Sequence, residues 1–135
     1  MSQRRFTMAA AGVAAVIATT WAIQSLYAQQ PGFTRVELQR HDLSTPGRET
    51  VQVRADFSPG GMVGKHTHPG EEVAYVLEGT IELEVEGKPR TLKAGDSFFV
   101  PAGTVHAAKN AGSTAAKVLA TYIVEKGKPL ATQVK

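Results

Sequence analysis

Three histidines and one glutamate are the residues of this chain whose types and spacing could do chemistry. His66 and His68 lie two positions apart, Glu72 follows His68 by four positions, and His106 lies in a second stretch further along the chain. Residues two apart on a strand point to the same face, so the first two imidazoles can reach one ion together. Imidazole and carboxylate groups suit transition metals, whereas Ca²⁺ and Mg²⁺ prefer mostly oxygen ligands. The pattern predicts one divalent transition metal: Fe, Mn, Ni, Co, Cu or Zn.

The parity of the strand that carries Glu72 separates this carboxylate from its neighbour. Ala74 and Val76 share the parity of Glu72 and are apolar, so Glu72 is predicted to point inward, and Glu71 is predicted to face solvent. The fourth histidine, His41, lies outside both stretches and is interpreted as a surface residue. Four protein ligands on an octahedral ion leave two positions free, as catalysis requires. A structural zinc site is more often closed by cysteines, which this chain lacks.

The surrounding chain has the pattern of short strands that could position such a site. Apolar and polar residues alternate over residues 51–57 and again over residues 81–86, where the polar face is entirely glutamate. Period two indicates half-buried strands, and no mature segment has a clear apolar period of 3.6. Six to eight strands at regular spacing, with glycine and proline between them, predict an all-β sandwich or barrel. No cysteine is available for disulfides or thiolate ligands.

The N-terminal segment is predicted to direct export. Arg4 and Arg5 precede an apolar run of 16 residues, positions 8–23, and a small residue, Ala28, ends the segment. This composition is typical of a secretory signal peptide. The run is shorter than the roughly 20 residues of a membrane span, and an uncleaved anchor is the alternative. An ordinary signal is favoured over twin-arginine export, and the destination would be the periplasm or the medium.

The sequence therefore predicts four segments: a signal segment (residues 1–28), an N-terminal arm (residues 29–49), a β-barrel (residues 50–126) and a C-terminal tail (residues 127–135). The arm contains a possible edge strand at residues 34–38. Removing residues 1–28 removes two arginines and no acids, so the net charge falls from +3 to +1. No basic block suited to a phosphate backbone remains, and nucleic acid is not expected as a partner.

Two stretches resemble the signature motifs of the cupin superfamily. They are Gly60-x5-His66-x-His68-x3-Glu72-x6-Gly79 and Gly95-x5-Pro101-x-Gly103-x2-His106-x3-Asn110, with 15 residues between them. The resemblance implies a double-stranded β-helix, or jelly-roll barrel, that usually forms a dimer. It implies metal ligation by the three histidines and the glutamate. It implies structural roles for the remaining signature residues, which are Gly60, Gly79, Gly95, Pro101, Gly103 and Asn110.

The first functional hypothesis is a small-molecule metalloenzyme, with oxygenase chemistry on an aromatic or phenolic compound first and lyase or isomerase chemistry next. Glu72 would be a proton acceptor as well as a ligand. The competing hypotheses are a non-catalytic module that binds a metal or small ligand, and a structural β-sandwich with vestigial ligands. The aromatic candidates for lining the cup are Phe57, Tyr75, Phe98, Phe99 and Tyr122, and core packing is the favoured interpretation for each. Parity places Phe57 and either Phe98 or Phe99 inside, and Tyr75 outside or against a second subunit.

Overall fold

The computed structural model describes residues 30–135, and the predicted signal segment lies outside the described residues. Residues 30–135 form strands and contain no helix. This part of the chain therefore has no helix long and apolar enough to cross a membrane. The strands are β1 Phe33–Asp42, β2 Arg48–Phe57, β3 Met62–Thr67, β4 Gly70–Glu78, β5 Thr80–Val85, β6 Lys88–Lys93, β7 Ser97–Val100, β8 His106–Lys109, β9 Ala116–Glu125 and β10 Thr132–Gln133.

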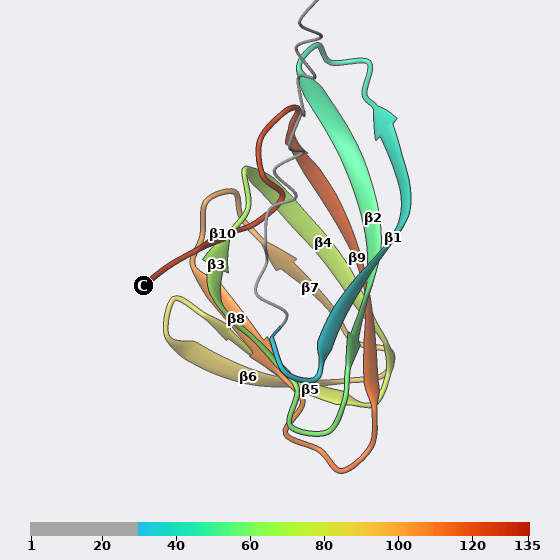
Figure 1. Ribbon diagram of the computed structural model, residues 1–135, viewed down its shortest axis with the longest axis vertical. Helices are drawn as coiled ribbons and strands as arrows, with labels where there is room; N and C mark the ends of the chain where they lie inside the picture. The colour runs from blue at the N-terminus through green and yellow to red at the C-terminus, as the bar shows by residue number, and fades with distance from the viewer. Residues whose placement is uncertain (1–29) are drawn as a thin grey trace, which may run out of the picture.

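The strands form two five-stranded antiparallel sheets that face each other (Figure 1). One sheet has the order β1-β2-β9-β4-β7 and contains the longest strands, and the other has the order β10-β3-β8-β5-β6. Chain neighbours such as β3 and β4 lie in different sheets, so the chain crosses repeatedly between the two layers. The prediction of an all-β jelly-roll barrel is confirmed. The predicted edge strand at residues 34–38 is part of the longer strand β1, which lies at a sheet edge.

The core is built from the alternating strands that the sequence predicted. Along β2, every second residue from Glu49 to Phe57 is buried, and β9 shows the same alternation from Ala116 to Val124. Ile81 and Leu83 of β5 are buried, while Glu82 and Glu84 on its other face form ion pairs with lysines of β8 and β3 of the same sheet. Period-two burial therefore assigns one face of each sheet to the shared interior.

The aromatic residues divide between the two faces in the same way. Phe57, Phe98 and Tyr122 are buried, whereas Phe99 and Tyr75 are about half exposed on the outer face of the first sheet. Phe98 is thus the inward member of the Phe98–Phe99 pair, and Tyr75 faces out as predicted.

Two signature residues show why the turns need their residue types. Gly79, between β4 and β5, has a φ of 71°, and an added Cβ would lie 2.5 Å from the carbonyl oxygen of Ala115. A side chain there would be strained and would clash with backbone. Asn110 is almost fully buried, donates hydrogen bonds to the carbonyl oxygens of Phe57 and Thr114, and accepts one from the backbone N–H of Gly112. This side chain satisfies backbone groups of two loops.

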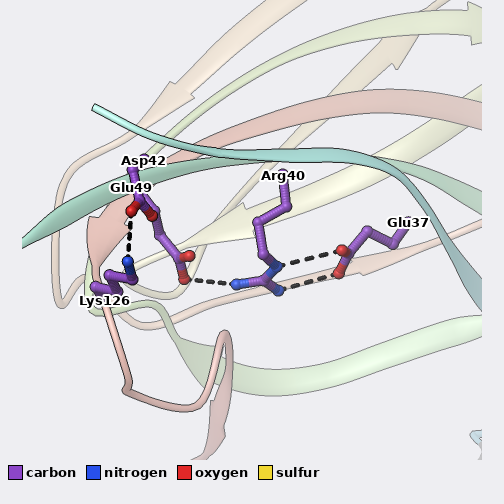
Figure 2. A network of polar contacts seen from close by, with 5 residues as sticks. All are labelled: Glu37, Arg40, Asp42, Glu49 and Lys126. Atoms are coloured by element: carbon purple, nitrogen blue, oxygen red, sulfur yellow. Dashed lines mark hydrogen bonds and ion pairs between the residues drawn. The ribbon is translucent and has the colours of Figure 1, made fainter. Parts of the chain in front are cut away.

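A network of charged side chains ties strands β1 and β2 to the end of β9 (Figure 2). Arg40 lies between two carboxylates, with Nη2 3.0 Å from Glu37 and Nη1 2.5 Å from Glu49. Lys126 lies 2.5 Å from Asp42. Glu49 is the buried member, because it occupies the core face of β2. The positive charge of Arg40 compensates the buried Glu49 carboxylate, which lies opposite the C-terminal end of β1.

Candidate metal centre

The candidate ligands come from three strands in two sheets. His66 lies in β3 and His106 opens β8, and these two residues are directly paired across the second sheet. His68 follows the end of β3, and Glu72 lies in β4 of the facing sheet. All four side chains are buried, each being 3–6% exposed. The site is therefore enclosed between the two layers of the barrel.

The four side chains converge on one point. Ring nitrogens of His66, His68 and His106 all lie within 4.8 Å of one another, and together they could hold a metal ion. The carboxylate oxygen Oε2 of Glu72 lies 3.2 Å from Nε2 of His68 and 3.2 Å from Nε2 of His106. Residues that the sequence places up to 40 positions apart are thus brought to a single cluster.

Backbone carbonyls fix the orientation of all three imidazoles. Nδ1 of His66 lies 2.7 Å from the carbonyl oxygen of Gly64, Nδ1 of His68 lies 2.5 Å from that of Leu130, and Nδ1 of His106 lies 2.9 Å from that of Thr104. A carbonyl oxygen only accepts, so each Nδ1 carries the hydrogen and each Nε2 presents its lone pair. This is the arrangement by which proteins orient histidine ligands of a metal.

The unsatisfied atoms of the cluster test whether it fits a metal. Nε2 of His68 and Nε2 of His106 are buried and have no hydrogen-bond partner, although Glu72 Oε2 is near both. The short N···O distances therefore lack hydrogen-bond geometry. Ligand atoms at about 2.1 Å from one ion and at right angles to each other would lie about 3 Å apart. The donor set and its spacing fit a divalent transition ion, which would satisfy these lone pairs.

The protonation states suit the same role. Burial, reinforced by the neighbouring imidazole of His106, lowers the pKa of His66 to about 3, so this imidazole is neutral at neutral pH. Burial alone would raise the pKa of Glu72, but the ring nitrogens of His106 and His68, 3.2 Å away, outweigh burial and lower the pKa to about 2. Glu72 is therefore an ionised carboxylate in the same cluster as the neutral imidazole of His66.

A cavity of about 30 Å³ adjoins the cluster, and His66, Glu72 and His106 contribute to its wall. Most of the remaining wall is apolar, and its two polar members are Tyr122 and Arg35. The ring of Tyr122 lies 4.5 Å from that of His68. Burial, followed by the charge of Glu72, raises the pKa of Tyr122, so the phenol stays protonated at neutral pH.

Arg35 is a residue of the site that sequence reasoning missed. It lies in β1, far from both motifs, and is directly paired with Ala55 of β2. Ala55 points into the core, and directly opposite residues of an antiparallel pair share a face. Arg35 therefore faces the interior, where its guanidinium lies 5.3 Å from the ring centroid of Phe33. Only the strand pairing, which the sequence did not specify, marks it as part of the site.

The two residues set aside from the predicted site lie away from the cluster. Glu71 is partly exposed, and its carboxylate lies 3.0 Å from Arg48. His41 is exposed on β1.

Comparison with known proteins places the chain in a family. Residues 53–122 match the sequence profile of the family described as "Cupin domain". This chain belongs to the cupin family.

Among its relatives, a germin-like protein of Arabidopsis thaliana (subfamily 2 member 1) is 42% identical over 89 residues, covering 59% of this chain and 41% of that protein. Oxalate oxidase 2 of Hordeum vulgare is 32% identical over 89 residues, covering 57% of this chain and 40% of that protein. The chain thus spans about two fifths of the length of these relatives.

Solved structures agree on the fold. An oxalate oxidase in complex with the substrate analogue glycolate aligns with a TM-score of 0.62 at 27% identity, covering 76% of this chain and 55% of that one. The polyketide cyclase RemF from Streptomyces resistomycificus aligns with a TM-score of 0.62 at 25% identity, covering 79% of this chain and 74% of that one.

Proposed function

We propose that this protein is a small-molecule metalloenzyme whose His66, His68, Glu72 and His106 hold one divalent transition ion. The observation that carries the proposal is the convergence of buried imidazole lone pairs and one ionised carboxylate on a point beside a cavity. When bound there, the ion would act as a Lewis acid or as the redox partner of dioxygen. The candidate ions for this donor set are Fe, Mn, Ni, Co, Cu and Zn.

The residues of the chain would divide the remaining work. The three histidines hold their lone pairs toward one point because their Nδ1 atoms are bound to backbone carbonyls. Glu72 supplies the negative charge of the cluster and could accept a proton from a substrate hydroxyl. Tyr122 and the apolar wall exclude bulk water from the cavity, which strengthens electrostatic interactions inside it.

Oxygen-dependent chemistry is the first choice of reaction, and lyase or isomerase chemistry is the second. Relatives named as oxalate oxidases support the first, and the similarity to the polyketide cyclase RemF supports keeping the second. Both kinds of chemistry need free coordination positions, which a site with four protein ligands provides on an octahedral ion.

The test is reconstitution of metal-free protein with each of the six ions, followed by a turnover screen. Oxygen consumption and product masses would be measured with oxalate, phenolic compounds and other small acids. Turnover with one ion, abolished in His68→Ala and kept in His41→Ala, is the expected result. Tight metal binding without turnover of any compound would instead favour the non-catalytic binding module, and failure to bind any ion would favour a vestigial site.

We also propose that the protein is exported and that two copies pair. The composition of residues 1–28 supports export, and secretion of a tagged full chain, lost when Arg4 and Arg5 become glutamate, would test it.

Val73, Tyr75 and Phe99 expose apolar surface on the outer face of the first sheet, which supports pairing of two copies there. Phe99→Asp should then convert a dimer to a monomer in light scattering.

A further inference from the structure

Among the three imidazoles of the candidate metal centre, that of His68 is the one oriented by a distant part of the chain. Nδ1 of His66 and Nδ1 of His106 each contact a carbonyl oxygen two positions back in the sequence. Nδ1 of His68 instead lies 2.5 Å from the carbonyl oxygen of Leu130, 62 positions further along. Two rings are therefore oriented by their local backbone, and the third depends on a segment that folds back after β9.

His68 needs such a partner because it lies in the turn between β3 and β4, outside the strand ladders. The backbone N–H of Gly103 donates a hydrogen bond of 3.1 Å to the carbonyl oxygen of His68 and holds its main chain. This bond does not select the rotation of the ring, because the outer torsion of a histidine side chain has a broad range. The contact of Nδ1 does select it, and Nε2 then lies 3.2 Å from Glu72.

Residues 127–134, here called the return segment, bring Leu130 to His68. The chain reverses at Gly127, whose φ is 81°, and β10 then pairs antiparallel with β3 (Figure 1). The backbone N–H of Val134 donates a hydrogen bond of 2.9 Å to a carbonyl oxygen of β3. The return segment is therefore attached to the strand that directly precedes His68.

A small apolar contact holds the return segment against the barrel. Ala131 is 4% exposed, and Leu130 packs against the hydrophobic core. Pro129 and Thr132, on either side of this pair, are exposed. Segments with few buried apolar contacts open more easily than long core strands. The return segment can therefore open while β2 and β9 stay folded.

The family match does not include the return segment. Residues 53–122 match the cupin profile, and they contain the four candidate ligands and the local carbonyl partners of His66 and His106. The carbonyl partner of His68 lies beyond the matched residues. The return segment is therefore an addition to the site that the family resemblance does not imply.

We propose that the return segment is a positioning element of the metal centre, in which the Leu130 carbonyl holds Nδ1–H of His68 and so directs the Nε2 lone pair at the ion. This role rests on the proposed function, because it concerns the ion that the site would hold. Outer hydrogen bonds of this kind fix the tautomer and orientation of a histidine ligand, and their loss typically weakens metal binding roughly 10–100-fold. Docking of the segment and metal binding should favour each other by the same factor, because coupling between two equilibria is reciprocal.

The first experiment displaces the return segment without adding charge. Ala131→Gln places a longer side chain at a buried position, and Ala94→Gln is the matched control, because Ala94 is exposed in the turn between β6 and β7. Zn²⁺ affinity is measured by calorimetric titration. The tautomers of the histidines are measured in metal-free protein through the NMR shifts of their side-chain nitrogens.

Ala131→Gln should bind Zn²⁺ roughly 10–100-fold more weakly than wild type, and Ala94→Gln should bind it like wild type. In metal-free Ala131→Gln, His68 alone should lose the pure Nδ1–H form, since His66 and His106 keep their local carbonyl partners. A purely structural role of the return segment would not single out one ring. Equal changes at all three rings would therefore overturn the proposal.

The second experiment uses wild-type protein and stays decisive if Ala131→Gln does not fold. Hydrogen exchange of the Val134 N–H reports opening of the return segment. The Leu43 N–H, which donates to the carbonyl oxygen of Arg48 in the turn after β1, is the control. Zn²⁺ should slow exchange at Val134 by roughly 10–100-fold, the factor of the affinity change, and leave Leu43 unaffected. Unchanged exchange at Val134 in Zn²⁺-saturated protein would contradict the coupling.

The outcomes separate this role from the metal site itself. If Zn²⁺ binds wild type and Ala131→Gln equally while Val134 exchanges freely in the variant, the positioning role is wrong and the metal site stands. If Zn²⁺ does not bind wild type, the proposed metal site is wrong. A change confined to His68 in metal-free Ala131→Gln would then still support Leu130 as the group that orients this ring.

Discussion

Two polar clusters of similar size in the barrel differ in whether the protein supplies cationic partners for their carboxylates. The network of Glu37, Arg40, Asp42, Glu49 and Lys126 combines three carboxylates with two cations, and its groups are mostly exposed. The buried cluster combines one carboxylate with three imidazoles. Counting the imidazoles as neutral, each cluster has a formal charge of −1.

The difference lies in the hydrogen-bond donors. In the network every carboxylate contacts a cationic N–H donor, so the network is complete within the protein. In the buried cluster the Nδ1 hydrogens are already used by backbone carbonyls, and what remains toward the centre is lone pairs. A buried set of acceptors without donors is costly unless a cation joins it. The network is therefore complete within the protein, whereas the buried cluster is an arrangement that could hold a metal ion.

The largest expected effect is the loss of metal binding in His68→Ala. Removing a direct ligand should lower metal affinity by more than the roughly 10–100-fold typical of second-shell partners. In wild type, metal at about 100 times its Kd should raise the free energy of unfolding by about 2.7 kcal/mol, and this gain should vanish in the variant. Calorimetric titration and denaturant unfolding with and without metal are the measurements. His41→Ala is the control, and wild-type affinity in His68→Ala would contradict the distinction between the clusters.

Glu72→Gln should produce the next largest effect. The substitution keeps the shape of the side chain and removes its charge, so metal affinity should fall about tenfold or more. The metal-free protein should unfold at an unchanged or higher denaturant concentration, because a buried charge has been removed. Glu71→Gln, on the opposite face of β4, should change neither quantity. If Glu71→Gln weakened metal binding and Glu72→Gln did not, the parity argument would be wrong.

Arg40→Met tests whether the network contributes to stability without affecting metal binding. It leaves the Glu49 carboxylate buried without its cation, and stability should fall by about 2 kcal/mol. The cost should stay below the roughly 3–5 kcal/mol of a fully buried pair, because the Arg40 side chain is 43% exposed. Metal affinity should not change. Urea unfolding and metal titration of the same preparation check both statements, and a coupled loss of metal binding would show that the two clusters are not independent.

Glu37→Gln should have the smallest effect, below about 1 kcal/mol, because the ion pair with Arg40 is exposed. The hydrogen bond with Arg40 lowers the pKa of Glu37. A carboxylate with a depressed folded-state pKa contributes stability above its unfolded pKa of about 4.3, and this contribution is lost as pH falls through the folded-state pKa. The difference in unfolding free energy between wild type and variant should therefore be present at pH 7 and shrink as the pH falls below about 4.3. A difference that grew at low pH would contradict the assignment.

The sequence predicted much of this molecule because two kinds of information are local. Alternation along β2 and β5 reports which face is buried, since side chains on a strand alternate between its faces. Parity likewise separated Glu72 from Glu71, and the two motifs indicated the family. Metal ligation by the four residues remains a prediction, which the convergence of the three histidines supports.

The residues that the sequence missed owe their place to contacts between distant segments. Arg35 faces the cavity because β1 pairs with β2 in a register that includes a bulge between Glu37 and Gln39, and a one-residue shift would have turned it outward. The Nδ1 of His68 is fixed by Leu130, 62 positions away. The choice between Phe98 and Phe99 also needed the pairing of β7 with β4.

The sequence by itself determined the strand pattern, the absence of thiolate ligands and the residue types of the candidate site. Each of these depends only on composition and on the period of a single strand. The tertiary structure alone decided that three imidazoles present their lone pairs to one buried point, and that an arginine from an edge strand shares their cavity. Both depend on strand register and on carbonyl groups brought in by distant segments, and such long-range geometry has no signal in the local order of residues.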